Sequence, residues 1–348
     1  MKDSNGLIEI IIPNWNGKEL LATCLQSLFL QTSQEFCVTV VDNGSTDGSR
    51  LLLHEQFPTV RLLEFSENRG FSAAINEGVR NSRASWILLL NNDIELASDC
   101  IETLVQAISS CHEFQFFALR MMSFHDRSVF DGAGDVVLRG GVGYRLGTME
   151  KDIGQYGSDR EVFGACAGAA LYNIEIFSRI GLFDEDFFAY LEDVDLNIRA
   201  RRAGFRCRYL AHAVVYHMGS ATTGSKINPL TVRLSTKNNL NVLVKNYPLS
   251  ILGRYLPVIL IYQLAWLAFV IKKKQIVAYL QGLGGGLRQF ALMIHKRRKI
   301  AKSVCISNQK FAQMLASAEQ EAVESIMARR QASGKGNMVL KLYQMLFL

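Results

Sequence analysis

The N-terminal part of the chain alternates short apolar runs with segments whose apolar positions recur every three or four residues. Four runs have the character of strands buried on both faces: 7–13, 36–41, 60–64 and 86–90. Residues 19–31 have the spacing of a helix, and a second helix is expected from Asn68 to about Asn81. Short apolar strands separated by helices predict an α/β fold with a mostly parallel central sheet flanked by helices.

A polar cluster follows each of these four runs. The clusters are PNWNG at 13–17, DNGSTDG at 42–48, ENRG at 67–70 and NND at 91–93. Because ligands of such sheets bind beyond the carboxyl ends of the strands, we expect the clusters to form one site. Asp42 and Asp93 can accept hydrogen bonds from a ribose or base there, or hold a divalent cation on phosphate oxygens. The residue types of DNGSTDG also build turns, so a turn alone explains that cluster equally well.

Several protein classes are excluded by motifs and composition. No G-x-G-x-x-G follows the first strand and no G-x-x-x-x-G-K-[ST] occurs, which excludes dinucleotide-binding dehydrogenases and P-loop NTPases. With 49% hydrophobic and 20% charged residues, the chain of 348 residues has enough apolar material to fold. Its 7 cysteines are never spaced C-x-x-C, which favours a reducing compartment over a disulfide framework or zinc ribbon. The first residues, MKDSNG, show no signal peptide.

The charges are segregated along the chain. Residues 1–195 contain 14 basic and 29 acidic residues, whereas residues 196–318 contain 20 basic residues and no acidic one. A long stretch without acids is expected to face an anionic partner such as a membrane leaflet, a phosphorylated substrate or nucleic acid. Nucleic acid is disfavoured because aromatic and basic residues do not alternate with polar groups that could read bases.

Two apolar runs lie within this basic stretch. Residues 255–271 end at three lysines, and residues 276–294 end at the basic segment 295–299. Apolar helices with basic flanks are typical of segments that lie in a membrane interface, so we expect residues 251–302 to associate with an anionic membrane surface. A buried core helix with a basic end is the alternative. Residues 303–348 are expected to form a helical tail.

Six ordered blocks identify the chain as similar to a known family. They are IIPNWNG, VVDNGSTDGS, ENRGFSAAINEG, WILLLNND, GLFDEDFFAYLEDVDLNIRARRAGFR and VVYHMGSATTG. Over about residues 7–250 the chain resembles the family 2 glycosyltransferases, and within them the bacterial rhamnosyltransferase-like branch. The resemblance implies a GT-A domain over 1–250, a dTDP- or UDP-linked sugar donor, a divalent metal (Mg or Mn) and inversion at the anomeric carbon.

The resemblance also assigns roles to residues of the first four blocks. Asp42 is expected to contact the base or ribose of the donor, and the other residues expected to line the donor site are Asn16, Asn68, Gly70 and Asn92. Asp93 stands at the last position of the D-x-D-like element and is expected to bind the metal, with His217 as a further ligand. Positions 91 and 92 are asparagine. This leaves a single carboxylate where some relatives have two.

The catalytic base is expected at the start of a helix. Residues 187–202 have helical periodicity, and a carboxylate near a helix N-terminus is stabilised by the helix dipole. By resemblance, Asp193 is the base that deprotonates the acceptor hydroxyl, and Glu192 orients the acceptor. The structural alternative is that these acids pair with nearby arginines, which the i,i+4 spacing favours for Asp195 and Arg199. The glycine-rich segment 132–168 is expected to form acceptor-side loops.

The resemblance therefore implies an inverting glycosyltransferase that adds a sugar, with rhamnose favoured, to a hydroxyl of a lipid-linked glycan acceptor in cell-surface polysaccharide synthesis. It is expected in the cytoplasm, peripheral on the inner face of the membrane. The alternatives are an inactive membrane-docking or scaffold protein that retains a nucleotide-sugar-binding domain, and a nucleic-acid-binding protein. A processive synthase is disfavoured because the nearest string to Q-x-x-R-W is QLAW at 263–266.

Overall fold

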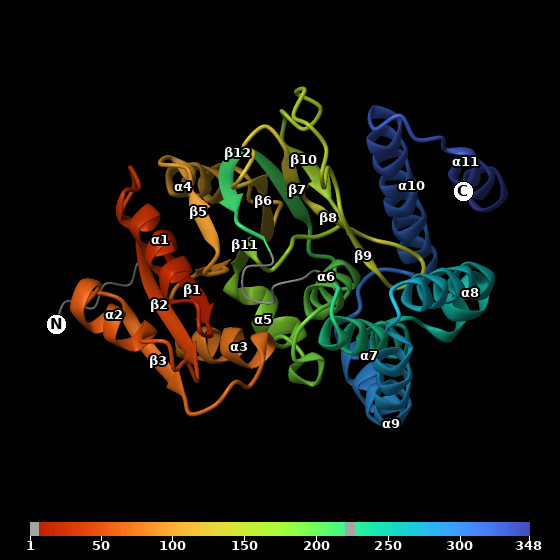
Figure 1. The fold of residues 1–348 in the computed structure, drawn as a ribbon, viewed down its shortest axis with the longest axis horizontal. Helices are drawn as coiled ribbons and strands as arrows, with labels where there is room; N and C mark the ends of the chain where they lie inside the picture. The colour runs from red at the N-terminus through yellow and green to blue at the C-terminus, as the bar shows by residue number, and fades with distance from the viewer. Residues whose placement is uncertain (1–6, 220–226) are drawn as a thin grey trace.

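The computed structural model describes residues 7–219 and 227–348 (Figure 1). The first six residues, and the end of the VVYHMGSATTG block at 220–224, therefore lie outside the described residues. The N-terminal half of the sheet consists of the parallel strands β1 (Ile8–Asn14), β2 (Phe36–Asn43), β3 (Arg61–Phe65) and β4 (Trp86–Leu90). The connecting helices are α1 (Lys18–Phe29), α2 (Ser49–Gln56) and α3 (Phe71–Asn81). The predicted alternation of strand and helix is confirmed.

The sheet continues beyond β4 with mixed strand directions. Its order is β10-β12-β6-β11-β4-β1-β2-β3, where β10 spans Arg160–Val162. Strand β5 (Ile94–Leu96) is paired to β12, and β7 (Phe130–Ala133) is paired to β6. Strands β6 (Phe116–Ser123) and β12 (Cys207–His217) are parallel, while β11 (Ala169–Asn173) runs antiparallel to both β4 and β6. The expected α/β fold with a largely parallel central sheet is confirmed, with antiparallel strands added in its second half.

Apolar side chains alternate between the two faces of the sheet. On β1, Ile8, Ile10 and Ile12 belong to one buried cluster and Ile11 belongs to the other. The first cluster includes residues of α1, α2 and α4 (Cys100–Ser110), and the second includes residues of α3, α5 (Ile174–Ile180) and α6 (Glu192–Arg202). Both faces are thus covered by helices, as the continuous apolar strands require.

The glycine-rich segment 132–168 is more ordered than the sequence suggests. It contains part of β7, the hairpin strands β8 (Asp135–Val137) and β9 (Gly143–Arg145), and β10 (Arg160–Val162). These strands interrupt the loops expected for this segment, and the sequence did not predict them because they are too short to show a period. Gly132 is needed for packing: a Cβ there would lie 2.2 Å from Cδ of Arg145.

The helix that carries Glu192 and Asp193 starts later than its periodicity predicts. Residues 185–187 form the 3-10 turn η1 (Glu185–Phe187), and α6 begins only at Glu192. Phe188, Tyr190 and Leu191 all have positive φ, which no α-helix accommodates. The prediction of a helix from residue 187 was therefore wrong at its N-terminal end.

The C-terminal part of the chain is helical and packs onto the sheet domain (Figure 1). Its helices are α7 (Pro229–Asn246), α8 (Leu249–Lys272), α9 (Ile276–Ile300), α10 (Asn308–Ala332) and α11 (Met338–Phe347), with the turn η2 (Ala301–Ser303) after α9. Residues of α6, α7, α8 and α10 and of the β8–β9 hairpin share a third buried cluster. Helix α9 is continuous through its glycines, and Gly282 and Gly286 lie against α7.

Candidate active site

The polar clusters that follow β1, β2 and β4 meet around Asn14. The register of the sheet places Asn14 beside Asp42, and Asn14 Nδ2 lies 3.5 Å from Asp42 Oδ2. Asn92 Nδ2 donates to Asn14 Oδ1 at 2.8 Å. All three side chains are buried. The carboxyl ends of the parallel strands thus form one polar edge, as expected, and Asn92 contributes to it by holding Asn14.

Asp42 is the buried anion of this edge. Its Oδ1 accepts from the backbone N–H of Ser45 at 3.0 Å and from Nε of Arg50 at 2.8 Å. The Ser45 bond is the turn-forming contact that the cluster composition allows, so Asp42 both builds the turn and presents a paired carboxylate. Arg50, a partner that sequence reasoning missed, lies eight residues later on α2, where only the fold brings it to the strand end.

The remaining donor-site candidates hold the neighbouring loops. Asn16 has φ 48° and its Oδ1 accepts from the Thr46 backbone N–H at 2.8 Å. Asn68 Oδ1 accepts from Asn43 at 3.1 Å and from the Gly70 backbone N–H at 2.9 Å. Gly70 has φ +88°, and a Cβ there would lie 2.6 Å from the Phe188 ring. Asn16, Asn68 and Gly70 therefore shape the edge of the sheet around Asp42.

Asp93 and His217 lie together on adjacent segments. Asp93 precedes β5, which pairs antiparallel with the end of β12, where His217 stands. His217 Nε2 lies 3.3 Å from Asp93 Oδ2, and its Nδ1 lies 2.9 Å from Oδ2 of Asp131. Burial alone would lower the pKa of His217, but its hydrogen bonds to Asp131 and Asp93 raise that pKa to about 9. Asp131, on β7, is a third member of this group that sequence reasoning missed.

This group is suited to a divalent metal. Asp93 is buried and its Oδ1 has no hydrogen-bond partner among the described residues. An imidazole whose other nitrogen faces a carboxylate has the orientation found in metal-binding histidines. One carboxylate and one imidazole fit Mg or Mn as part of a ligand set that a diphosphate would complete. The two predicted metal ligands are thus adjacent, although their metal binding stays a prediction.

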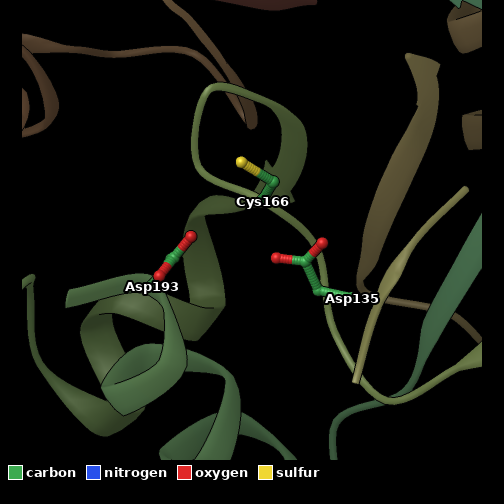
Figure 2. A group of neighbouring side chains, drawn as sticks. All are labelled: Asp135, Cys166 and Asp193. Atoms are coloured by element: carbon green, nitrogen blue, oxygen red, sulfur yellow. The ribbon is translucent and has the colours of Figure 1, made fainter. Parts of the chain in front are cut away.

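A second group of acids lies at the start of α6. Asp193, Asp135 and Cys166 point toward one another from α6, the start of β8 and the 163–168 loop (Figure 2), with their ligand atoms within 4.8 Å of one another. Arg145 supplies positive charge to this group: its Nη2 donates to Cys166 Sγ at 2.8 Å and its Nε lies 3.7 Å from Asp135 Oδ1. These three side chains could also hold a cation, beside the single positive charge that Arg145 already supplies.

The pKa values of these carboxyls are perturbed. Burial raises the pKa of Asp135 to about 7, with Arg145 opposing the shift and Asp193 adding to it. Burial, followed by the charge of Asp193, raises the pKa of Glu192 to about 8, so Glu192 is largely protonated at neutral pH. Burial raises the pKa of Asp193 as well, and the Arg145 guanidinium and backbone N–H groups oppose this rise only in part. Both predicted catalytic carboxyls therefore have raised pKa values, and the roles expected of Asp193 and Glu192 stay predictions.

Asn238 and Asn197 hold the backbone around Asp193. Asn238, on α7, donates from Nδ2 to the carbonyls of Phe187, Ala189 and Tyr190 at 2.7–3.0 Å. These hydrogen bonds hold the strained backbone before α6 in place. Asn197, on α6, exchanges hydrogen bonds with both backbone groups of Ala165 in the loop of Cys166. Gly164 is required beside it, because a Cβ there would lie 2.3 Å from Asn197 Cγ. Packing thus accounts for the small residues of this loop.

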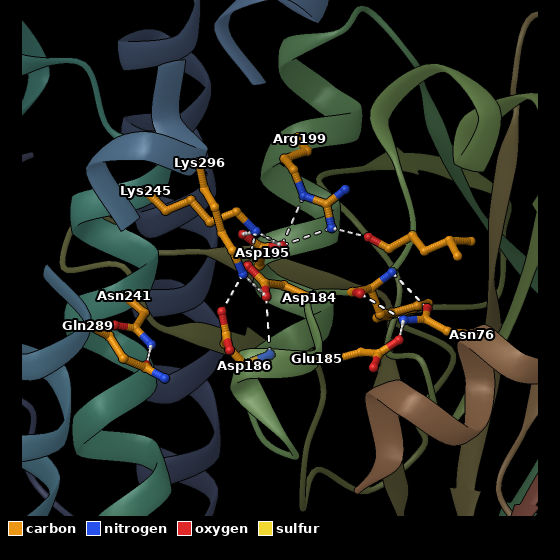
Figure 3. A network of polar contacts seen from close by, with 12 residues as sticks. Asn76, Asp184, Glu185, Asp186, Asp195, Arg199, Asn241, Lys245, Gln289 and Lys296 are labelled. Carbon is orange, nitrogen blue, oxygen red and sulfur yellow. Dashed lines mark hydrogen bonds and ion pairs between the residues drawn. The ribbon is translucent and has the colours of Figure 1, made fainter. Parts of the chain in front are cut away.

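Buried ion pairs fix α6 to its neighbours (Figure 3). Asp195 pairs with Arg199 at 2.8 Å, as the i,i+4 spacing predicts, and with Lys245 of α7 at 2.8 Å. Lys245 also pairs with Asp184, which in turn pairs with Lys296 of α9. Burial would raise the pKa of Asp195, but the charges of Arg199 and Lys245 hold it well below its usual range. Asp195 is thus structural, and the network fixes the start of α6.

Arg145 and Asp131 connect the two groups of acids. Asp131 contacts His217 on one side and forms an ion pair with Arg145 on the other. Arg145 then reaches Asp135 and Cys166 beside Asp193. The candidate metal ligands and the candidate base therefore belong to one continuous site. Asp135 and Arg145 lie in the glycine-rich segment 132–168 and Asp131 directly before it, and their charge there was the sequence signal for them.

Comparisons with known proteins agree with this architecture. Residues 9–181 match the model of the family described as "Glycosyl transferase family 2". The chain is 29% identical over 240 residues to the N-acetylglucosaminyl-diphospho-decaprenol L-rhamnosyltransferase of Mycobacterium tuberculosis, covering 63% of this chain and 78% of that protein. It is 27% identical over 224 residues to the O-antigen biosynthesis protein RfbC of Myxococcus xanthus, covering 62% of this chain and 17% of that protein.

Solved structures show the same fold at low sequence identity. GalNAc-T7, solved with UDP, GalNAc and Mn2+, aligns with a TM-score of 0.56 and 13% identity over 70% of this chain and 48% of its own. S. aureus TarS 1–349 aligns with a TM-score of 0.50 and 15% identity over 94% of this chain and 92% of its own. These likenesses support the GT-A fold.

Proposed function

Because the chain belongs to the family 2 glycosyltransferases and is similar to their rhamnosyltransferase-like branch, we propose that it transfers a sugar, with rhamnose favoured, to a hydroxyl of a lipid-linked glycan acceptor. The mycobacterial relative is named for L-rhamnosyl transfer to a decaprenol-linked acceptor, and the Myxococcus relative for O-antigen biosynthesis. These names support a role in cell-surface polysaccharide synthesis. The donor is a dTDP- or UDP-linked sugar, and the GalNAc-T7 structure, which has the same fold, was solved with UDP.

The donor occupies the polar edge beyond β1, β2 and β4. Asp42 accepts hydrogen bonds from the ribose or base, and Asn16, Asn68, Gly70 and Asn92 shape the surface around it. Asp93 and His217 would hold Mg or Mn against the diphosphate. When bound, that cation neutralises negative charge on the departing nucleoside diphosphate. The unpartnered Oδ1 of Asp93 supports this assignment.

The acceptor is activated from the opposite side of the site by Asp193. The Asp193 carboxylate takes the proton of the acceptor hydroxyl as that oxygen bonds to the anomeric carbon. The bond from the anomeric carbon to the diphosphate oxygen breaks, and the electron pair leaves with the nucleotide, so a single displacement inverts the anomeric centre. Backbone hydrogen bonds from Val194 and Ala167 orient the carboxylate. Protonated Glu192 donates to the acceptor.

One observation carries the proposal: Asp131 and Arg145 join the Asp93–His217 pair to the group around Asp193. A direct test incubates the full chain with dTDP-rhamnose or UDP-sugars, a polyprenyl-diphosphate-linked GlcNAc acceptor and Mg or Mn, and follows product by mass spectrometry. We expect one donor to be used, with an anomeric configuration in the product opposite to that of the donor. A product that retains the donor configuration would contradict the mechanism.

The alternative is an inactive scaffold with a nucleotide-sugar-binding domain. Its support is that Asn91 and Asn92 stand where some relatives have acids. The Asn92 side chain donates a hydrogen bond to Asn14, and the backbone N–H of Asn91 donates one to the Gly168 carbonyl. Both contacts are structural. Donor binding without turnover for any acceptor would favour the scaffold.

The proposed location is the cytoplasmic face of the membrane, where a lipid-linked acceptor would be available. The described residues contain one helix, Leu249–Lys272, that is long and apolar enough to cross a membrane. Basic residues follow it directly at 272–274. This composition supports contact with an anionic leaflet.

A further inference from the structure

Helix α8 is attached to the rest of the protein along one face for nearly its whole length. Ile251, Tyr255 and Val270 are buried at the two ends of this face. Tyr255 Oη donates to the Ala312 carbonyl of α10 at 2.9 Å. Further along, Gln263 and Trp266 donate to Asn239 and Thr236 of α7 at 2.6 and 2.9 Å. The contacts on this face therefore continue from the first turn to the last.

A helix attached in this way cannot cross a bilayer. With 24 residues, α8 is about 36 Å long, enough for a hydrocarbon core of about 30 Å. Crossing would carry the attached α7 and α10 into lipid, together with their buried polar groups, at a high desolvation cost. The geometry is instead that of a helix lying in the plane of the interface with one face on the protein.

The opposite face of α8 exposes large apolar side chains. Those with at least half of their surface exposed are Leu249, Leu256, Leu260, Leu264 and Ile271. They are distributed from the beginning to the end of the helix. A row of exposed aliphatic residues of this length is unusual on a protein surface that faces only water.

Helix α11 adds a second row beside α8. It has no buried residue, and its exposed apolar side chains are Met338, Val339, Leu342, Met345 and Leu346. Its other face is fixed to the protein: Tyr343 bonds Glu319 of α10, and the Phe347 carbonyl accepts from Nη1 of Arg139 at 2.9 Å. Tyr343 also contacts Tyr262 of α8. Figure 1 shows α11 at the same end of the molecule as α8.

Helix α9 contributes a third apolar row at this end of the molecule (Figure 1). Gly282 and Gly286 pack against α7, while Val277, Leu280, Leu287 and Phe290 are exposed. Residues of α8 and α9 share a small buried cluster that includes Val270 and Tyr279. The two helices are therefore held together beneath their exposed faces.

The charge around these rows fits an anionic partner. Exposed basic residues flank them: Arg254, Lys272, Lys273, Lys274, Arg288, Lys335 and Lys341. No acidic residue occurs between 196 and 318, and the acids of the chain are concentrated before residue 196. An anionic surface would attract the helical end of the molecule and repel the end formed by β1–β3.

We propose that the exposed faces of α8, α9 and α11 together form a docking surface for an anionic lipid bilayer, into which the three helices dip in-plane without crossing it. This inference rests on the proposed function in one respect, the expectation that the acceptor is bound to a membrane. It assigns lipid contact to α11 at the end of the tail. A second copy of the chain is the competing occupant of the same apolar surface.

The test is flotation of the full-length protein with phosphatidylcholine vesicles, with and without phosphatidylglycerol. The variants are Leu260→Asp with Leu264→Asp on α8, Leu342→Asp with Met345→Asp on α11, and Lys272, Lys273 and Lys274→Gln. The matched control is Leu30→Asp with Leu51→Asp, which changes two exposed leucines of the sheet domain. All altered side chains are exposed, so we expect every variant to fold. Circular dichroism and thermal melting of each variant check this.

We expect vesicle binding that requires anionic lipid, a roughly tenfold or greater loss for the α8 and α11 variants, and no change in the control. The lysine variant should bind anionic and neutral vesicles equally weakly. Alkaline carbonate should extract the bound protein. Resistance to extraction would show spanning, and unaltered binding of the α11 variant would remove that helix from the surface.

A dimer in solution that fails to bind vesicles, and that dissociates in the α8 or α11 variant, would assign the surface to a second copy. Sugar transfer to a water-soluble acceptor analogue should persist in every variant, since the altered residues lie outside the site. Absence of transfer in the wild-type chain would contradict the proposed function, while the vesicle result would stand on its own.

Discussion

Asp135 and Arg145 face each other across the β8–β9 hairpin, as register partners at its open end. The other end of the same hairpin packs on the C-terminal helices: the Leu138 carbonyl accepts from Tyr247 at 3.1 Å, and Gly140 lies against Tyr262. One hairpin therefore connects the acids of the site to the helices that carry the proposed docking surface.

Arg145 should control the pH at which the base is ionised. Its charge lowers the pKa of Asp193, which burial raises. Arg145→Gln should therefore shift the acidic limb of the kcat/KM profile toward higher pH. Arg145→Lys keeps the positive charge, so it should restore much of the activity that the glutamine variant loses at low pH. The pH profile of each variant is the measurement. Arg127→Gln, which removes an exposed arginine paired with Glu95, is the control.

An activity-independent measurement separates this electrostatic role from a purely structural one. A carboxyl whose pKa is raised on folding binds protons more tightly in the native state, so its contribution to stability falls as pH rises through its folded pKa. Without Arg145 the pKa values of Asp135 and Asp193 should rise further. The loss of stability with rising pH should therefore be larger and extend to higher pH. Urea titrations between about pH 5 and 8 should show it. A uniform loss of activity with an unchanged limb would contradict the assignment.

Asp131 should tune metal binding through His217. The substitution Asp131→Asn removes the carboxylate that faces Nδ1 of His217, and it should weaken Mn affinity by about 10- to 100-fold. Isothermal titration of the folded variant measures this without turnover. Glu95→Gln changes a nearby acid on β5 that contacts Arg127, and it should leave Mn affinity intact. Equal affinity in the Asp131 variant and the wild type would exclude the metal from this position.

The buried network of Figure 3 should dominate acid stability. The pKa of Asp195 in the folded protein lies below that of an ordinary aspartate. Its ion pairs therefore stabilise the fold at any pH above the ordinary aspartate pKa, and this stabilisation is lost as the pH falls through the folded pKa. Asp195→Asn leaves Lys245 and Arg199 without this partner and should lower the free energy of unfolding by roughly 3–5 kcal/mol at neutral pH.

Urea denaturation at neutral and acidic pH provides the measurement. The difference between Asp195→Asn and the wild type should shrink as the pH falls. Glu77→Gln removes the half-buried partner of the exposed Arg80 and should cost about 0–1 kcal/mol. Equal effects of the two substitutions would show that burial of the network adds nothing.

The sequence predicts the first half of the fold well because each strand there is a continuous apolar run. Asn14, Asp42 and Asn92 follow such runs, so their meeting at one edge follows from parallel pairing. The hairpin is different: β8 and β9 have three residues each, and no period can be recognised in so short a strand. The pairing of Asp135 with Arg145 depends on that register.

The start of α6 shows a tertiary contact overriding a local pattern. The apolar spacing of residues 187–202 continues through Phe188 and Leu191, yet both have positive φ. Asn238 satisfies the carbonyls of this segment from a helix more than forty positions later. Sequence periodicity cannot register such a bond, although it located Glu192 and Asp193 correctly on the helix.

The most direct test of the account is a comparison of Asp193→Asn with the wild-type chain in donor binding and in single-turnover transfer. Removing the base should slow transfer by about 10²- to 10⁴-fold while donor affinity stays near that of the wild type, because the carboxylate acts only as the acceptor is deprotonated. Asp159→Asn, which changes a carboxylate paired with Arg208, should leave both quantities unaltered. Transfer by Asp193→Asn at the wild-type rate would contradict the mechanism.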